Sequence, residues 1–324
     1  MKQKFLALFS FLAGITMLGC SAVFEGGDSA YTSSAEAEIE SVDLVQTGTY
    51  TNTLEADGLE RMYLLHVPES ANSPDPLPLL LNLHGFTGTS ESQLGYADFR
   101  AIADREGIIL VYPQGTLLNN DTHWNVGSWT SASTVDDTAF LSELIDVLIA
   151  DFNVDADRVY SIGHSNGGFM SFLLACQAGE KITAIASISG TMSPENFAEC
   201  EPSHPTPVLQ IHGTADSVIP YGGASWTKSV EDVLDYWIEF NQLDDTPLVS
   251  EIAPNPDSNA SSKVIRMEFS SADSAAVVEH IMVEGGGHEW LGQTNIAGEA
   301  NLDLDTNEEI WSFLSQFSLD QLEP

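Results

Sequence analysis

Ser165 lies in the segment Gly163-His164-Ser165-Asn166-Gly167, which matches the G-x-S-x-G pattern of a serine on a sharp turn. Residues 159–162 before it are typical of a buried strand, and residues 168–178 after it are typical of a helix. Small residues two positions before and after the serine let strand and helix approach closely, and the free N–H groups of the helix can bind an oxyanion. This context predicts that Ser165 is a nucleophile; the alternative is a serine that caps an ordinary helix.

A serine hydroxyl needs a general base, and the base needs a carboxylate to orient it. His288 is the candidate base because it follows Gly285-Gly286-Gly287, a flexible segment directly after a predicted strand. Asp216 is the candidate acid because it follows the predicted strand 208–212 and stands between Ser165 and His288 in the chain. The other histidines after the serine lie in predicted strands or in a loop before any convincing acid: His204, His212 and His280.

The oxyanion of acyl transfer needs two backbone N–H donors. We expect them from Asn166, at the start of the helix after the serine, and from Phe86, in the loop that follows the predicted strand 77–83. His84 precedes the nucleophile, so we interpret it as a residue that orders this loop. Asp136 and Asp137 stand where a helix N-cap belongs, and we assign them to capping and framework roles.

Strand and helix patterns alternate along the chain, which indicates a mostly parallel central sheet with helices on both faces, as in the α/β-hydrolase fold. Catalytic residues then belong at the carboxyl ends of the strands. The predicted strands are 62–67, 77–83, 108–112, 159–162, 182–188, 208–212, 263–270 and 277–283. The predicted helices are 92–106, 138–152, 167–178, 229–242 and 307–317.

Several short segments in the same order resemble the polyhydroxybutyrate depolymerase/feruloyl esterase family of secreted α/β-hydrolases. They are Leu83-His84-Gly85, Tyr112-Pro113-Gln114-Gly115, Trp124-Asn125-Val126-Gly127, Asp136-Asp137, Arg158-Val159-Tyr160, Gly163 to Gly168, His212-Gly213-Thr214-Ala215-Asp216 with Pro220-Tyr221, and Gly285-Gly286-Gly287-His288-Glu289-Trp290. The resemblance implies a Ser165–Asp216–His288 triad, oxyanion donors at Phe86 and Asn166, and a cysteine pair at 176 and 200. Leu291 and Leu243 depart from the family's usual Pro and Cys.

The resemblance implies a carboxylic ester hydrolase without a cofactor, and the sequence shows no zinc-ligand spacing and no phosphate-binding glycine loop. Asn166-Gly167-Gly168 looks more like the feruloyl and acetyl-xylan esterases of the family than its polymer depolymerases. Trp124, Trp129 and Trp290 are candidates for an aromatic platform in the substrate pocket, with core packing as the alternative. The rival functions are a polyhydroxybutyrate depolymerase, a serine peptidase on the same fold, and a surface lipoprotein that binds without catalysis.

The first 20 residues resemble an export signal. Lys2 and Lys4 precede an apolar stretch at 5–17 that is too short to span a bilayer, and Met17-Leu18-Gly19-Cys20 resembles a bacterial lipoprotein signal. We therefore expect a signal peptide at 1–19, lipid on Cys20, a flexible tether at 20–45 and a catalytic domain at 46–324. An ordinary cleaved signal peptide is the alternative. Either case places the protein in the periplasm, on the outer surface or outside the cell.

The net charge of −38, from 48 acidic and 10 basic residues, excludes nucleic acid and anionic lipid as partners. A neutral ester is the expected substrate, and the only expected membrane contact is the lipid on Cys20. The acidity serves either solubility or adaptation to salt. With Cys20 lipidated, Cys176 and Cys200 remain, and an oxidising compartment favours one disulfide between them over two separate buried thiols.

Overall fold

The computed structural model describes residues 45–258, 262–292 and 301–322. The predicted signal peptide, the lipidation site Cys20 and the predicted tether up to residue 44 lie outside these residues. None of the helices in the described part of the chain is long and apolar enough to cross a membrane.

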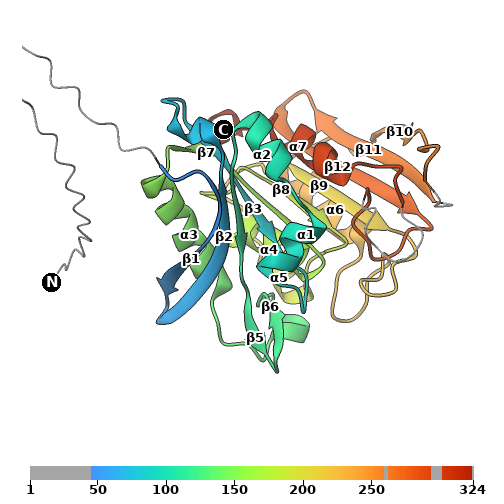
Figure 1. Ribbon diagram of the computed structural model, residues 1–324. Coiled ribbons are helices and arrows are strands. Elements are labelled where there is room, and N and C mark those ends of the chain that lie inside the picture. Colours follow the sequence, from blue (N-terminus) through green and yellow to red (C-terminus); the bar gives the residue numbers. More distant parts are fainter. Residues whose placement is uncertain (1–44, 259–261, 293–300, 323–324) are drawn as a thin grey trace, which may run out of the picture. The chain divides into compact units, whose positions relative to one another are not determined.

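A ten-stranded sheet in the order β1-β2-β4-β3-β7-β8-β9-β12-β11-β10 forms the centre of the fold (Figure 1). Its strands are β1 Gly48–Ala56, β2 Leu59–Val67, β3 Leu77–Leu83, β4 Ile109–Pro113, β7 Val154–His164, β8 Ala184–Ile188, β9 Val208–Gly213, β10 Leu248–Ile252, β11 Lys263–Ser271 and β12 Ser274–Glu284. A separate hairpin consists of β5 Thr116–Leu118 and β6 Asp121–His123. The helices are α1 Ser90–Tyr96, α2 Arg100–Glu106, α3 Asp137–Asp151, α4 Asn166–Gln177, α5 Pro194–Ala198, α6 Val230–Phe240, α7 Thr306–Leu314 and α8 Leu319–Leu322.

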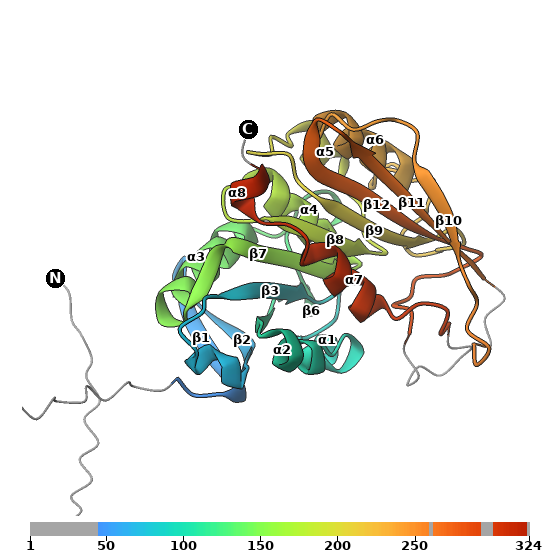
Figure 2. The same ribbon diagram turned by 90° about the horizontal axis from the view of Figure 1, so that it is seen from above.

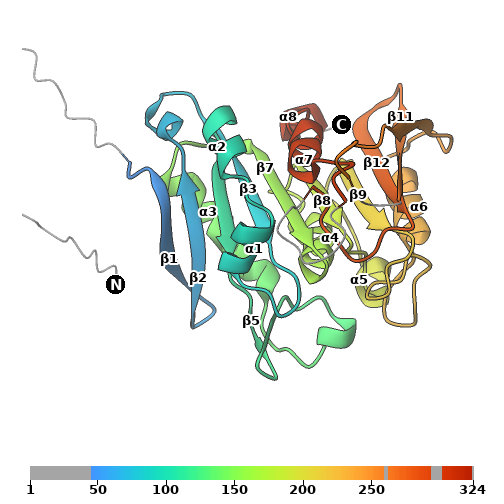
Figure 3. The same cartoon turned by 45° about the vertical axis from the view of Figure 1, so that its right-hand side comes forward.

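The middle of the sheet is parallel, from β4 through β3, β7, β8 and β9 to β12. Antiparallel strands flank it, with β1 and β2 at one edge and β11 and β10 at the other (Figure 3). Because parallel strands share one orientation, the loops after β3, β7, β9 and β12 leave the same edge of the sheet. The predicted α/β-hydrolase fold with a mostly parallel central sheet is confirmed.

Helices cover both faces of this sheet. In β3, Leu79, Leu81 and Leu83 belong to the apolar cluster that also contains residues of α3, α4 and α6, whereas Leu80 faces the other way and belongs to the cluster that contains residues of α2 and α7. This alternation follows from the two-residue period of a strand, and both faces are apolar because both are buried. Figure 2 shows α3, α4 and α6 on one side of the sheet and α1, α2 and α7 on the other.

The helix predicted over 92–106 is in fact two helices, α1 and α2. The chain turns at Ala97–Phe99, where the Tyr112 hydroxyl donates to the Ala97 carbonyl at 2.8 Å and accepts from the Phe99 N–H at 3.1 Å. A tyrosine on β4 therefore satisfies the backbone groups that the interruption leaves open.

The two acids at the start of α3 have the framework roles expected of them. Asp136 is the N-cap and accepts the Ala139 N–H at 2.9 Å. Asp137 is buried and pairs with Arg61 at 2.7 Å, and its second oxygen accepts the Asn125 N–H at 2.8 Å. A buried carboxylate with both a cation and an amide partner holds the loop beginning at Asn125 against α3.

The predicted disulfide between Cys176 and Cys200 is present. It joins the last turn of α4 to the segment after α5. Because α4 begins at Asn166, the bridge anchors the far end of the helix that follows Ser165.

Candidate active site

Ser165 occupies a strained turn between β7 and α4. Its backbone has φ 55° and ψ −119°, a region that residues other than glycine rarely adopt. A side chain on Gly163 would meet the Gly167 carbonyl carbon at 2.2 Å, and one on Gly167 would meet the Leu83 carbonyl oxygen at 2.2 Å. The two glycines of the motif are thus required by the close approach of β7, α4 and the end of β3.

His288 and Asp216 form a hydrogen-bonded pair. His288 Nδ1 lies 2.7 Å from Asp216 Oδ2, and the Asp216 side chain is fully buried while that of His288 is 17% exposed. The other oxygen of Asp216 accepts the N–H groups of Val218 at 2.8 Å and Ile219 at 2.9 Å. Burial alone would raise the pKa of Asp216, but hydrogen bonds from His212 and His288 outweigh it and hold that pKa well below its usual range.

The loops after β9 and β12 are bound to each other, which places the acid next to the base. The Thr214 N–H donates to the Val283 carbonyl, and the Ala215 N–H donates to the Gly286 carbonyl, each at 2.9 Å. His288 in turn lies beside the serine turn, since its ring centroid is 4.8 Å from that of His164. Burial lowers the pKa of His164 to about 3, so this neighbour is neutral. The structure thus brings together the sequence-predicted serine, acid and base at one edge of the sheet.

The two candidate oxyanion donors lie on segments that are tied together. Asn166 accepts the Trp124 N–H at 2.7 Å and donates to the Trp124 carbonyl at 3.1 Å through its side-chain amide. Trp124 Nε1 donates to the His84 carbonyl at 2.9 Å, two residues before Phe86. Within the described residues, neither the Phe86 nor the Asn166 backbone N–H is taken by a protein acceptor. Both amides are therefore available to a ligand.

His84 supports the Phe86 loop, as the sequence suggested. It is buried, its Nδ1 donates to the Gly85 carbonyl at 2.7 Å, and its Nε2 accepts the Gly115 N–H at 2.9 Å. Burial lowers the pKa of His84 to about 4, so the ring is neutral and can accept this bond.

Of the two interpretations of Trp124 and Trp290, the structure favours core packing, and neither residue lines the pocket at the serine. Their exposed fractions are 0% and 1%, because Trp124 packs beneath the Phe86 loop and Trp290 donates to Asn307 at 2.9 Å within the core. The pocket at the serine has a volume of about 300 Å³ and is lined by Phe86, Trp129, Ser165, Val218, Ile219 and Trp226. Sequence reasoning missed Trp226, although an aromatic residue in the loop after a parallel strand could have drawn attention to it.

The walls of this pocket are aromatic and mutually supported. The rings of Phe86 and Trp129 meet edge to face at 5.0 Å, and Trp129 also contacts Phe169 on α4. The Ser128 hydroxyl donates to the Trp226 carbonyl at 2.8 Å, which fastens the loop carrying Trp226 to the loop carrying Trp129. Apart from the serine, the lining is apolar, so the pocket suits an apolar or aromatic group.

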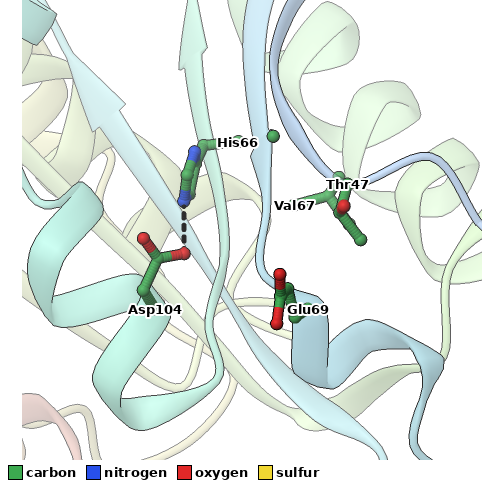
Figure 4. A pocket seen from close by; sticks show the side chains of 6 residues that line it. Thr47, His66, Val67, Glu69 and Asp104 are labelled. Atoms are coloured by element: carbon green, nitrogen blue, oxygen red, sulfur yellow. Dashed lines mark hydrogen bonds and ion pairs between the residues drawn. The ribbon is translucent and has the colours of Figure 1, made fainter.

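A second pocket, of about 400 Å³, lies elsewhere and has the acidic residues Glu69 and Asp104 in its lining (Figure 4). It is at the end of β2, which runs antiparallel to β4 and so ends at the opposite edge of the sheet from Ser165. His66 contacts Asp104 at 2.9 Å and Thr49 at 2.8 Å, so both of its ring nitrogens are engaged. Across residues 45–258, 262–292 and 301–322, no group of three histidine, cysteine or acidic side chains is placed to hold a metal ion.

The fold and the serine turn define an α/β-hydrolase. Comparison with known families identifies the family within this fold class. The phospholipase/carboxylesterase family matches residues 83–246, about half of the chain. The chain belongs to this family. The matched region contains Ser165 and Asp216 and ends before His288.

Relatives of described function are esterases. The chain is 28% identical over 257 residues to the bifunctional acetylxylan esterase/xylanase XynS20E of Neocallimastix patriciarum, covering 79% of this chain and 33% of that protein. It is 24% identical over 261 residues to feruloyl esterase B of Piromyces equi, covering 80% and 46%. The chain thus spans less than half the length of either relative. The acetyl xylan esterase of Aspergillus awamori has the same fold, with a TM-score of 0.58 at 16% identity over 82% of this chain and 99% of that one.

Proposed function

We propose that the protein is a serine hydrolase of carboxylic esters that acts through Ser165, His288 and Asp216. The observation that carries the proposal is the 2.7 Å contact from His288 Nδ1 to the buried Asp216 carboxylate, beside the strained turn that presents Ser165 to an apolar pocket. A histidine held in this way has Nε2 available as a base toward a serine.

The proposed reaction has two halves. Ser165 Oγ attacks the ester carbonyl carbon while His288 Nε2 takes the hydroxyl proton, and the carbonyl oxygen becomes an oxyanion held by the N–H groups of Phe86 and Asn166. The carbon–oxygen bond to the alcohol then breaks, and His288 gives the proton to the leaving alcohol, which leaves an acyl-enzyme. Water repeats the sequence, with His288 as base and then as acid, and releases the carboxylic acid and free Ser165.

The pocket indicates the acyl group. Phe86, Trp129 and Trp226 offer aromatic faces and edges to a flat ring, and the anionic protein disfavours acidic substrates. Together with the feruloyl and acetylxylan esterases among its relatives, this supports neutral feruloyl or acetyl esters as substrates. Methyl ferulate and methyl acetate share an alcohol and differ in the acyl group, so their relative rates test the assignment.

Replacing Trp226 with alanine should reduce the preference for the aromatic acyl group. Loss of one aromatic contact is worth about 1 kcal/mol, so kcat/KM for methyl ferulate should fall about fivefold to tenfold, with little change for methyl acetate. Leu248→Ala is the matched control, because Leu248 is an exposed apolar residue on the edge strand β10 and should change neither rate. An equal loss for both esters would show that Trp226 does not select the acyl group. Rapid clearing of solid polyhydroxybutyrate, with no hydrolysis of either ester, would instead identify a depolymerase.

We also propose that the protein is exported and carries lipid on Cys20, on the basis of its N-terminal sequence. Cells that express the full chain and are fed radiolabelled palmitate should label the protein, and Cys20→Ser should remove the label. Equal labelling of both proteins would contradict the proposal.

A further inference from the structure

We propose that His212, at the end of β9, is a positioning residue that fixes the acid Asp216, with Gln210 setting its tautomer. The proposal rests on the triad proposed above and adds the side chains that hold its acid in place.

The Asp216 carboxylate is surrounded by donors on both of its oxygens. Oδ1 accepts two backbone N–H groups, from Val218 and Ile219. Oδ2 receives His288 Nδ1 at 2.7 Å and lies 3.4 Å from His212 Nε2, and the side chains of both Asp216 and His212 are fully buried. His212 is thus the only side chain besides His288 in contact with this carboxylate among the ion pairs of the described residues.

The hydrogen bonds around Gln210 determine which nitrogen of His212 carries the proton. The side-chain nitrogen of Gln210 donates to the Gly190 carbonyl at 2.8 Å, and a carbonyl can only accept, which fixes the orientation of the amide. The same nitrogen lies 3.1 Å from His212 Nδ1, so it donates its second hydrogen there and Nδ1 accepts. This arrangement assigns the acceptor role to Nδ1 and the donor role to Nε2 of His212.

His212 Nε2 directs its N–H to the turn that holds the acid. It lies 2.9 Å from the Ile219 carbonyl and 3.4 Å from Asp216 Oδ2. Ile219 is also the residue whose N–H binds Asp216 Oδ1. One imidazole N–H thus fastens the turn 216–219 through its carbonyl and contacts the carboxylate directly, so the orientation of Asp216 depends on it.

The other histidines and the tyrosine that lie near His212 and Asp216 do not carry a charge next to the carboxylate. His164 faces it from the end of β7, and burial lowers the pKa of His164 to about 3. Tyr221 lies beside His212, and His280 on β12 lies beside Gln210. Burial lowers the pKa of His280 to about 4 and raises that of Tyr221 to about 12. Tyr221 donates to His280 Nε2 at 2.9 Å and His280 Nδ1 donates to the Gln210 carbonyl at 2.9 Å, so neither reaches Asp216.

Removal of the His212 donor should shift the pH profile of kcat/KM in a definite direction. Without it, the Asp216 carboxylate keeps more negative charge for His288 and thereby stabilises the protonated imidazole. In His212→Phe we expect the acid limb of the kcat/KM pH profile to move upward by about half a pH unit. Looser placement of Asp216 should lower kcat about tenfold or more, with KM little changed. His212→Gln, whose side-chain amide can return an N–H to the same place, should recover most of the rate and the original limb.

His280→Phe is the matched control because it removes another buried histidine from the neighbouring strand β12. We expect it to lower the melting temperature without moving the pH limb. If His212→Phe does not fold, Gln210→Leu keeps the histidine but frees its tautomer, and it should move the limb in the same direction. If the His212 variants lose only thermal stability and keep both kcat and the pH limb, the proposal is overturned.

The series also separates failure of this proposal from failure of the proposed triad. If Asp216→Asn retains activity, the triad assignment fails. If Asp216→Asn is inactive while His212→Phe keeps the parent rate and pH profile, only the role of His212 fails.

Discussion

Ser165→Ala should abolish ester hydrolysis while leaving the fold intact. Loss of a nucleophilic serine that works with a histidine and an acid typically lowers kcat by about 10⁴-fold to 10⁶-fold. The change removes one hydroxyl at a turn whose shape is set by the packing of Gly163 and Gly167, so the melting temperature should stay close to that of the parent. The measurement is the rate of p-nitrophenyl acetate hydrolysis, together with thermal unfolding.

Ser161→Ala is a suitable control for this experiment. Ser161 is also a buried serine on β7, and it shares a hydrogen bond with Ser171 at 2.9 Å, away from the pocket residues. It should cost stability and leave kcat nearly unchanged. If Ser165→Ala keeps more than a few per cent of the parent rate, Ser165 is not the nucleophile.

Asp216→Asn should lower kcat about 10⁴-fold with little change in KM. Among the described residues, the hydrogen-bond and ion-pair partners of the carboxylate are donors, namely two backbone N–H groups, His212 Nε2 and His288 Nδ1. An asparagine replaces one acceptor oxygen with an NH₂ group. With its oxygen on the backbone amides, that NH₂ faces His288 and favours the tautomer whose Nε2 already carries a proton, which cannot accept the proton of Ser165.

Asp232→Asn is a control for the general effect of removing one negative charge. Asp232 is on the surface of α6, where it pairs with Lys228 at 2.9 Å. Surface pairs of this kind contribute little, so both rate and stability should be unchanged. Retention of kcat within tenfold of the parent by Asp216→Asn would contradict the role assigned to Asp216.

Much of the fold and the three candidate catalytic residues could be predicted from the sequence because they depend on local sequence patterns. The apolar run of β3, the strand before Ser165 and the helix after it are each continuous in the chain. The order serine, acid, histidine excludes the histidines that precede Ser165. Of the histidines that follow it, two are excluded as bases because they stand inside predicted strands. His212 and His280 are indeed buried within β9 and β12.

The remaining features depend on contacts between distant segments. The interruption between α1 and α2 is satisfied by Tyr112 on β4, which no local pattern reveals. Trp124 and Trp226 both stand in loops at the catalytic edge, yet Trp124 is buried under the Phe86 loop and Trp226 faces the pocket. Whether a loop tryptophan packs inward or lines a cavity depends on tertiary packing. The partnership of Gln210 with His212 likewise becomes visible only when the Gly190 carbonyl is placed beside them.

Covalent trapping of the nucleophile tests the central claim most directly. The protein is treated with an organophosphate ester such as diethyl p-nitrophenyl phosphate, which transfers its phosphoryl group to an activated serine and releases p-nitrophenol. We predict one equivalent of p-nitrophenol per protein, complete loss of esterase activity, and a phosphorylated peptide in which mass spectrometry places the group on Ser165, with no adduct in Ser165→Ala. Full inactivation with the group on another residue, or equal labelling of Ser165→Ala, would contradict the account.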